Sequence, residues 1–324
     1  MQSTSNRVYI NEVAPRDGFQ GESVFIPTAE KVALIDRLST TGLAKIEVTS
    51  FTSPKAIPNL RDAEEVMCQI RRAPGVRYTA LVPNVKGFER ARACQVDEVN
   101  FVMSASESHN YANLRMSCEQ SLAQLAEISH GARPSSIFVN ASLSTAFGCP
   151  FEGRIHEDRV FAFVQSFLDR GVQGVTLCDT TGVADPRQVQ RLCEAVLKRW
   201  PAVRFTVHFH NTRAMGLCNV LSALNAGMRH IDASLGGLGG CPYAPGASGN
   251  VCTEDVVHML QQMGYDTGVN LEHLIAIAQH LPALVGHEVP GQVAKAGPAD
   301  RRFLGPAPIH LLDPVLDWLD RCDV

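Results

Sequence analysis

The sequence has no long hydrophobic run and no strong excess of charge of one sign. No stretch approaches the ~18 consecutive apolar residues that span a bilayer. The first residues, 1–6, do not place an apolar segment behind a basic start, so we expect no secretory signal. The formal net charge of −4 gives no basic field for a nucleic-acid backbone or an anionic membrane. We therefore expect a cytoplasmic chain without nucleic-acid or membrane partners.

Paired cysteine motifs are absent as well. The chain has ten cysteines, but no two have the CxxC spacing, and in 324 residues they do not indicate a disulfide framework. We expect most of them to be small buried hydrophobic residues. The exception is Cys241, which lies in a glycine-rich segment.

A hydrophobic content of 45% and a charged content of 19% exclude a disordered chain. Short apolar segments rich in β-branched residues recur about every 30 residues, as expected for strands buried on both faces. The eight predicted strands are 8–10, 45–48, 78–82, 98–102, 137–140, 174–177, 205–209 and 230–233.

Helical periodicity separates these strands. After Thr28, apolar residues fall on one face of a predicted helix. A second helix is indicated by Asp185 as N-cap, followed by Pro186 at the first helical position. An apolar stripe over 217–224 indicates a third. Eight β–α units predict an α/β fold, a closed (β/α)₈ TIM barrel over residues 1–285. A doubly wound open sheet is disfavoured, because no GxGxxG follows the first strand.

Residues 286–324 contain more proline and glycine and end in an apolar segment over 311–319. We expect this stretch to be a C-terminal helical appendage to the barrel.

Candidate metal ligands stand at predicted strand ends, where barrel enzymes place their chemistry. His208 and His210 are two residues apart on the seventh strand, so both side chains face the same way. The alternative is a pair of core histidines bonded to backbone. Asp17 follows the first strand and Asn250 the eighth. Two imidazoles, a carboxylate and an amide oxygen favour Mg²⁺ or Mn²⁺ over a thiolate-rich zinc site.

Three further charged residues are candidates. Arg16 precedes Asp17 and could belong to a site or to a capped turn. Glu47 lies inside the second strand, where a buried charge is costly unless paired, so it could bond Arg16 or help to position a proton. Asp179 ends the sixth strand and could cap the next turn or take part in catalysis.

The segment 236–250 carries four glycines within five residues but lacks the GKS/T ending of a phosphate-binding P-loop. Ordering so many glycines costs backbone entropy, so we expect a mobile lid that closes over substrate. Cys241 would then be a thiol carried into the closed site.

These motifs resemble the 3-hydroxy-3-methylglutaryl-CoA lyase family, which belongs to the metal-dependent lyases and synthases with an Arg-Asp motif on a TIM barrel. The resemblance covers about residues 7–285, and its most specific part is the Gly-Leu-Gly-Gly-Cys-Pro-Tyr-Ala run. It rests on residues 11–18, 46–55, 208–210 and 236–250.

The resemblance implies a role for each candidate. Arg16 would face the thioester carbonyl and bind substrate together with Gln20, Cys241 would be the reactive thiol of the lid, and Glu47 or Asp179 would act in catalysis. The implied metal ligands are Asp17, His208, His210 and Asn250.

The implied reaction is cleavage of 3-hydroxy-3-methylglutaryl-CoA to acetyl-CoA and acetoacetate. A divalent cation lowers the pKa of the substrate hydroxyl, the C2–C3 bond breaks, and Arg16 stabilises the thioester enolate. We also expect an acyl-CoA partner, a role in leucine catabolism, and a homo-oligomer such as a dimer.

One departure keeps alternatives open. Many lyases of the family read His-Asp-Thr-Tyr-Gly where this chain has His210-Asn211-Thr212-Arg213-Ala214. Because these residues beside the metal site differ, the alternative of a citramalyl-CoA lyase, which would give pyruvate and acetyl-CoA, stays open. The reactive-thiol loop and the lack of a regulatory domain argue against a Claisen-type synthase. The presence of every candidate ligand argues against a non-catalytic barrel.

Overall fold

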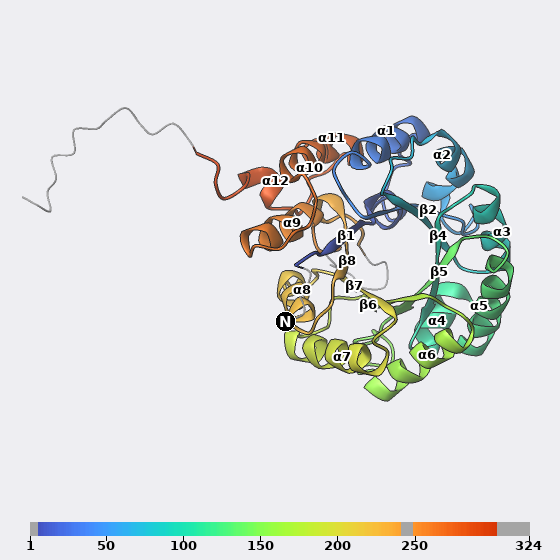
Figure 1. Cartoon of the computed structure of the whole chain (residues 1–324). Coiled ribbons are helices and arrows are strands. Elements are labelled where there is room, and N and C mark those ends of the chain that lie inside the picture. Colours follow the sequence, from blue (N-terminus) through green and yellow to red (C-terminus); the bar gives the residue numbers. More distant parts are fainter. Residues whose placement is uncertain (1–5, 241–248, 303–324) are drawn as a thin grey trace, which may run out of the picture.

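Eight parallel strands close into a barrel with helices around the outside (Figure 1). The computed structural model describes residues 6–240 and 249–302. All eight predicted strands are confirmed, and the closed barrel rather than the open sheet is observed. The strands are β1 (Tyr9–Glu12), β2 (Lys45–Ser50), β3 (Arg77–Val82), β4 (Glu98–Ser104), β5 (Phe138–Ser144), β6 (Gly174–Asp179), β7 (Arg204–Phe209) and β8 (His230–Ala233).

The barrel closes where β1 pairs with β8. Tyr9 lies opposite His230 and Glu12 opposite Ala233, so the first strand and the last run side by side. Side chains on the outer face of the strands pack under the helices. Val175 and Val207, on strands, and Phe167, on an outer helix, are fully buried there. This packing forms the hydrophobic core. Its burial stabilises the fold by about 25 cal/mol for each Å² of apolar surface removed from water.

Helices follow the strands around the barrel. The predicted N-cap of α7 is confirmed, since the Asp185 carboxylate accepts from the backbone N–H groups of Arg187 and Gln188. The helices are α1 (Thr28–Leu38), α2 (Ala63–Gln69), α3 (Val85–Ala93), α4 (Glu107–Leu114), α5 (Cys118–Ala132), α6 (Glu157–Asp169), α7 (Pro186–Arg199), α8 (Gly216–Asn225) and α9 (Thr253–Gln262). Short turns of helix are η1 (Ala14–Gly18), η2 (Pro58–Leu60) and η3 (Leu235–Gly237).

Extra C-terminal helices are present, as predicted, but two of them begin earlier than expected. Of α10 (Leu271–Ala278), α11 (Leu281–Val285) and α12 (Val293–Ala296), only α12 lies within the range predicted as the appendage. The chain past residue 285 docks on the barrel's outer helices, because the Asp255 carboxylate of α9 accepts from the N–H groups of Gln292 and Val293. The apolar segment predicted over 311–319 lies outside the described residues.

No helix of the described part of the chain is long and apolar enough to cross a membrane. The eight cysteines that the structure describes are all free thiols, as expected.

The cap of α7 yields a test of the fold. Asp185→Ala removes an acceptor that satisfies two backbone N–H groups at 2.9 and 3.0 Å, so the free energy of unfolding should fall by about 1 kcal/mol. Urea denaturation followed by circular dichroism measures this. Glu194→Ala, on the exposed side of the same helix, is the matched control. Equal midpoints for the two variants would contradict the capping role.

Candidate active site at the carboxyl ends of the strands

The site is built around η1, a single π-helical turn directly after β1. The carbonyl of Val13 accepts from the N–H groups of Arg16 and Asp17, which turns the chain sharply at the barrel mouth. Proline at the start of the turn needs no backbone hydrogen bond there. The turn therefore presents Arg16 and Asp17 together at the carboxyl ends of the strands.

Glu12, at the end of β1, ties this turn to the segments that follow the neighbouring strand β8. One carboxylate oxygen accepts from the N–H groups of Ala14 and Leu235, each at 2.8 Å. The other oxygen accepts from the Thr253 hydroxyl at 2.8 Å. Burial, partly offset by these hydrogen bonds, raises the pKa of Glu12 to about 7. One buried side chain thus fixes η1, η3 and the start of α9 relative to one another.

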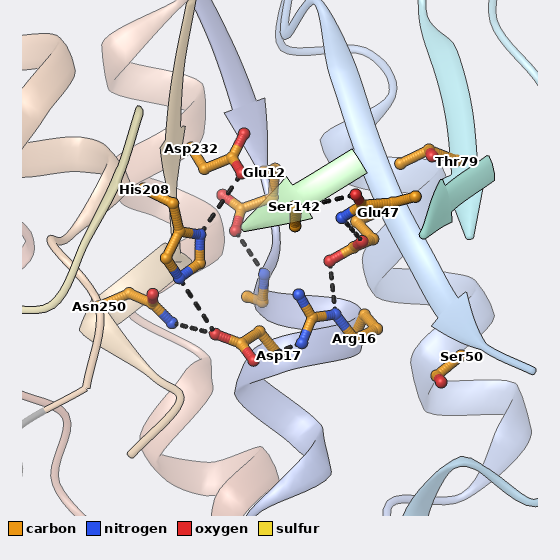
Figure 2. Close-up of polar contacts among 12 residues, drawn as sticks. Glu12, Arg16, Asp17, Glu47, Ser50, Thr79, Ser142, His208, Asp232 and Asn250 are labelled. Atoms are coloured by element: carbon orange, nitrogen blue, oxygen red, sulfur yellow. Dashed lines mark hydrogen bonds and ion pairs between the residues drawn. The ribbon is translucent and has the colours of Figure 1, made fainter. Parts of the chain in front are cut away.

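Asp17, His208 and His210 converge on one point, with ligand atoms within 4.8 Å of one another. Figure 2 shows Asn250 and His208 both facing the carboxylate of Asp17. Asn250 Nδ2 donates to Asp17 Oδ2 at 2.7 Å, and His208 Nε2 lies 3.7 Å from the same oxygen. The four predicted ligands, contributed from segments after β1 and β8 and from β7, are therefore neighbours.

Unsatisfied polar atoms show that these residues fit a metal ion. His210 Nδ1 and Asn250 Oδ1 are buried and have no hydrogen-bond partner among the described residues. Buried polar atoms without a partner are rare in proteins and indicate a place for a bound ion or water. His208 Nδ1 lies 3.4 Å from Asp232 Oδ2, an arrangement that leaves Nε2 facing Asp17. A carboxylate behind the imidazole is the usual support of a metal-binding histidine.

Protonation states agree with ligation. Burial opposes ionisation of Asp17, but Arg16 and the two histidines outweigh it and lower its pKa to about 2. Burial, with added repulsion from His208, lowers the pKa of His210 to about 4. At neutral pH the carboxyl group is therefore ionised and the His210 imidazole neutral, which are the forms that bind a cation.

Arg16 is held in place by two carboxylates. Its Nε donates to Glu47 Oε2 at 2.5 Å and its Nη1 to Asp17 Oδ1 at 2.5 Å. The other oxygen of Glu47 accepts from Asn100 Nδ2 at 2.8 Å, and the Ser142 hydroxyl donates to Asn100 Oδ1 at 2.8 Å. Of the two predictions for Glu47, the pairing with Arg16 is the one observed.

Asp179 is engaged by backbone. Its two oxygens accept from the N–H groups of Val183 and Ala184, at 2.8 and 3.1 Å. Burial outweighs these hydrogen bonds and raises the pKa of Asp179 to about 6. The capping interpretation accounts for both oxygens, and a catalytic role stays a prediction.

A cavity of about 590 Å³ opens beside these residues. Arg16, Asp17, His208 and His210 line it, and Gln20 lines it near η1. Several residues at this site were not predicted from the sequence, although one of them carries a recognisable pattern. Asp232 is a charged residue inside a buried strand, the same pattern that singled out Glu47. The other lining residues without an earlier prediction include Asn100, Ser142, Cys178 and Thr180.

Glycines after β8 allow a close approach of backbone to Asn250. Gly239 has a φ of +103°, and a Cβ there would lie 2.5 Å from Asn250 Nδ2. A Cβ on Gly249 would lie 2.1 Å from the carbonyl oxygen of Gly237. At these positions glycine is needed for space and conformation, a reason separate from the predicted mobility. Residues 241–248 of the predicted lid, Cys241 among them, lie outside the described residues.

Arg213, which stands where many lyases of the family have tyrosine, joins two loops at the mouth of the barrel. Its Nη1 donates to the carbonyl oxygens of Thr181 and Gly182, at 3.0 and 2.9 Å. The guanidinium group therefore links the loop after β7 to the loop after β6.

Comparison with known proteins identifies the family. The HMGL-like family model matches residues 7–281. The hydroxymethylglutaryl-CoA lyase YngG of Bacillus subtilis is 45% identical over 286 residues, 88% of this chain and 96% of the relative. The (R)-citramalyl-CoA lyase of Chloroflexus aurantiacus is 39% identical over 311 residues, 93% of this chain and 98% of the relative.

Solved structures agree. The structure of an HMG-CoA lyase from Acinetobacter baumannii, in complex with coenzyme A and 3-methylmalate, matches with a TM-score of 0.91 and 48% identity. The match covers 94% of this chain and 100% of that one. The resemblance stated from the motifs is thereby confirmed, and the chain belongs to the HMGL-like family.

Proposed function

We propose that this chain is a metal-dependent carbon–carbon lyase that cleaves 3-hydroxy-3-methylglutaryl-CoA to acetyl-CoA and acetoacetate. The convergence of Asp17, His208 and His210 on one point beside Arg16, in one cavity, is the observation that carries the proposal. The identity of 45% to a hydroxymethylglutaryl-CoA lyase supports it.

Asp17, His208, His210 and Asn250 would hold a divalent cation, Mg²⁺ or Mn²⁺, because their donor atoms are oxygen and imidazole nitrogen. When bound, the cation supplies a Lewis acid that lowers the pKa of the substrate's tertiary hydroxyl group. Asp232 orients His208 through Nδ1.

Arg16 would stabilise the charge that develops on the substrate. A general base would take the hydroxyl proton as the C2–C3 bond breaks. C3 and its oxygen then become the ketone of acetoacetate, and the electron pair of the broken bond passes to C2, which turns the thioester into an enolate. A fixed guanidinium group beside the enolate oxygen lowers the energy of that state. A proton added to C2 then gives acetyl-CoA, and we propose the Cys241 thiol as its source.

Glu47 would act through Arg16 as a positioning residue, because both of its oxygens already accept hydrogen bonds. Gln20, at the edge of the cavity, would contact the substrate. The solved complex of a relative with coenzyme A supports an acyl-CoA partner. We further propose a cytoplasmic location, a homodimer, a role in leucine catabolism, and a domain boundary near residue 285.

A second candidate substrate is citramalyl-CoA, which would give pyruvate and acetyl-CoA. The 39% identity to an (R)-citramalyl-CoA lyase and the presence of Arg213 at the rim favour it. Its acyl group is one methylene shorter. A single methylene is worth only about 1–3 kcal/mol of discrimination, so both substrates could react at different rates.

Steady-state kinetics with both acyl-CoAs tests the proposal. The purified protein, supplied with Mg²⁺ or Mn²⁺, should have the higher kcat/KM with 3-hydroxy-3-methylglutaryl-CoA, and acetoacetate should form in equal amount to acetyl-CoA. A higher kcat/KM with citramalyl-CoA would select the second candidate. Turnover of neither compound would overturn both.

Removal of the metal tests the ligand set. Chelation should abolish turnover, and Mg²⁺ or Mn²⁺ should restore it. His210→Ala removes a proposed ligand, so metal content and turnover should fall together, as measured by elemental analysis and by assay. His273→Ala, on α10 and outside the cavity, is the control and should retain both. Full turnover of metal-free His210→Ala protein would contradict the metal site.

Replacement of the guanidinium group tests the role of Arg16. Arg16→Gln should lower kcat by ~10²-fold or more, the scale of losing one oxyanion stabiliser, while the metal content stays unchanged. Glu47→Gln keeps the side chain's shape but weakens the ion pair, so its loss of kcat should be smaller. If Arg16→Gln raises KM and leaves kcat near the original value, the residue only binds substrate.

A further inference from the structure

A ring of charged side chains stands at the end of the barrel opposite the candidate active site. Lys45, Arg77, Glu98 and Arg204 are the first residues of β2, β3, β4 and β7. They therefore meet at the amino-terminal ends of the strands, whereas the proposed metal ligands lie at or beyond the carboxyl ends. Nothing in the proposed lyase chemistry uses them.

One buried carboxylate faces three cations in this ring. Glu98 is fully buried, and its Oε1 accepts from Lys45 Nζ at 2.8 Å. Its Oε2 accepts from Arg204 Nη2 at 2.6 Å and from Arg77 Nη1 at 3.1 Å. Three positive charges against one negative charge leave an excess of two. Both carboxylate oxygens are occupied, so Glu98 cannot satisfy the remaining donors of the three cations.

The nearby charged groups do not cancel the whole of this excess. Asp232 is the next carboxylate toward the barrel mouth and attracts Lys45, but its single charge is shared with His208 Nδ1, and it also accepts from Asn11 Nδ2 at 2.8 Å. Asp97 accepts from the backbone N–H of Tyr78 and lies 3.8 Å from Arg72. His230 also faces the ring. Burial, and then the positive charges of Arg204 and Lys45, lower its pKa to about 4, as expected in a positive field.

A cavity of about 220 Å³ adjoins the ring. Lys45, Arg77 and Arg204 line it together with Asn11 and Thr206. The side chains of Lys45, Arg204 and Arg77 are 10%, 24% and 39% exposed, so part of each cationic side chain is open to solvent. The volume is below the roughly 300–1,000 Å³ of pockets for drug-sized ligands, which favours a compact ion.

The guanidinium groups are fixed before any ligand arrives. Arg204 lies over the Phe138 ring at 3.8 Å from its centroid, and Arg77 lies 5.1 Å from the same centroid. Both also bond Glu98 Oε2. A rigid pair of guanidinium groups with an ammonium group opposite matches the oxygens of an anion and loses little side-chain entropy on binding.

We propose that this cavity is a binding site for a small oxyanion that carries two or more negative charges, such as inorganic phosphate or a short dicarboxylate. The charge excess of the ring sets the charge of the ligand, and the cavity volume limits its size. The site is independent of the proposed lyase function, because it lies at the other end of the barrel and shares no ligating residue with it.

Isothermal titration calorimetry on metal-free protein at constant ionic strength tests the proposal. The titrants are phosphate, sulfate and malonate, with chloride as the monovalent comparison. Binding of phosphate or malonate well above that of chloride is expected, and the ratio of the two tells whether the site prefers an inorganic ion or a dicarboxylate. Equal response to all anions at matched ionic strength would overturn the proposal.

Variants locate the site. Arg204→Gln should weaken binding by tenfold or more while lyase turnover is retained, and Arg77→Gln, at a more exposed position, serves if the first variant does not fold. Arg92→Gln, which removes a surface cation paired only with Glu89, should change nothing. Arg16→Gln removes a cation from the cavity of the candidate active site and should also retain anion binding. Unchanged binding in both ring variants, or loss of binding in Arg16→Gln alone, would refute this location.

Removal of the negative charge of Glu98 gives an independent check of the proposed site. Glu98→Gln raises the charge excess from two to three, so the increase in Tm caused by phosphate should be larger in this variant than in the original protein. A smaller increase would mean that the ring is a structural ion-pair cluster only.

Discussion

Pairing of β1 with β8 is the constraint on which the candidate site depends. Asp17 and Asn250 are more than two hundred residues apart in the chain, yet Asn250 Nδ2 donates to Asp17 at 2.7 Å. That contact exists because the first strand and the last are neighbours in a closed barrel. Glu12 strengthens the closure, since one carboxylate bonds to groups on both sides of the seam. In an open sheet with β1 and β8 at opposite edges, the predicted ligands could not meet.

The barrel interior carries charged and amide side chains along its length, and each buried carboxylate there faces a cation. Glu98 is matched to cations near one end, and Glu47 is matched to Arg16 near the other. Asn100 and Asn140 lie between them, joined by a hydrogen bond of 3.0 Å. Removing one partner of a buried ion pair costs about 3–5 kcal/mol, so each pair is strongly constrained by its neighbours. The interior therefore holds the site residues in fixed positions.

The strands and the convergence of His208 and His210 with Asp17 could be predicted from the sequence, because buried parallel strands and same-face histidines leave local patterns. The π-helical turn after β1 could not be predicted, since Pro15 and Gly18 are equally compatible with an ordinary turn. The support of His208 by Asp232, and the ring around Glu98, also escaped prediction. Both depend on contacts between residues of different strands, which no local periodicity records.

The amide of Asn250 has a consequence for the charge of the proposed metal site. Aspartate is the commoner oxygen ligand for a hard cation, but an acid here would bring its own oxygen against Asp17 Oδ2 in place of a donor at 2.7 Å. The amide avoids that repulsion, and the proposed ligand set then carries a single negative charge from Asp17. A divalent ion would keep a net charge of +1 after binding. That residual charge is free to attract the anionic oxygens of an incoming substrate, so a neutral ligand makes the site electrophilic.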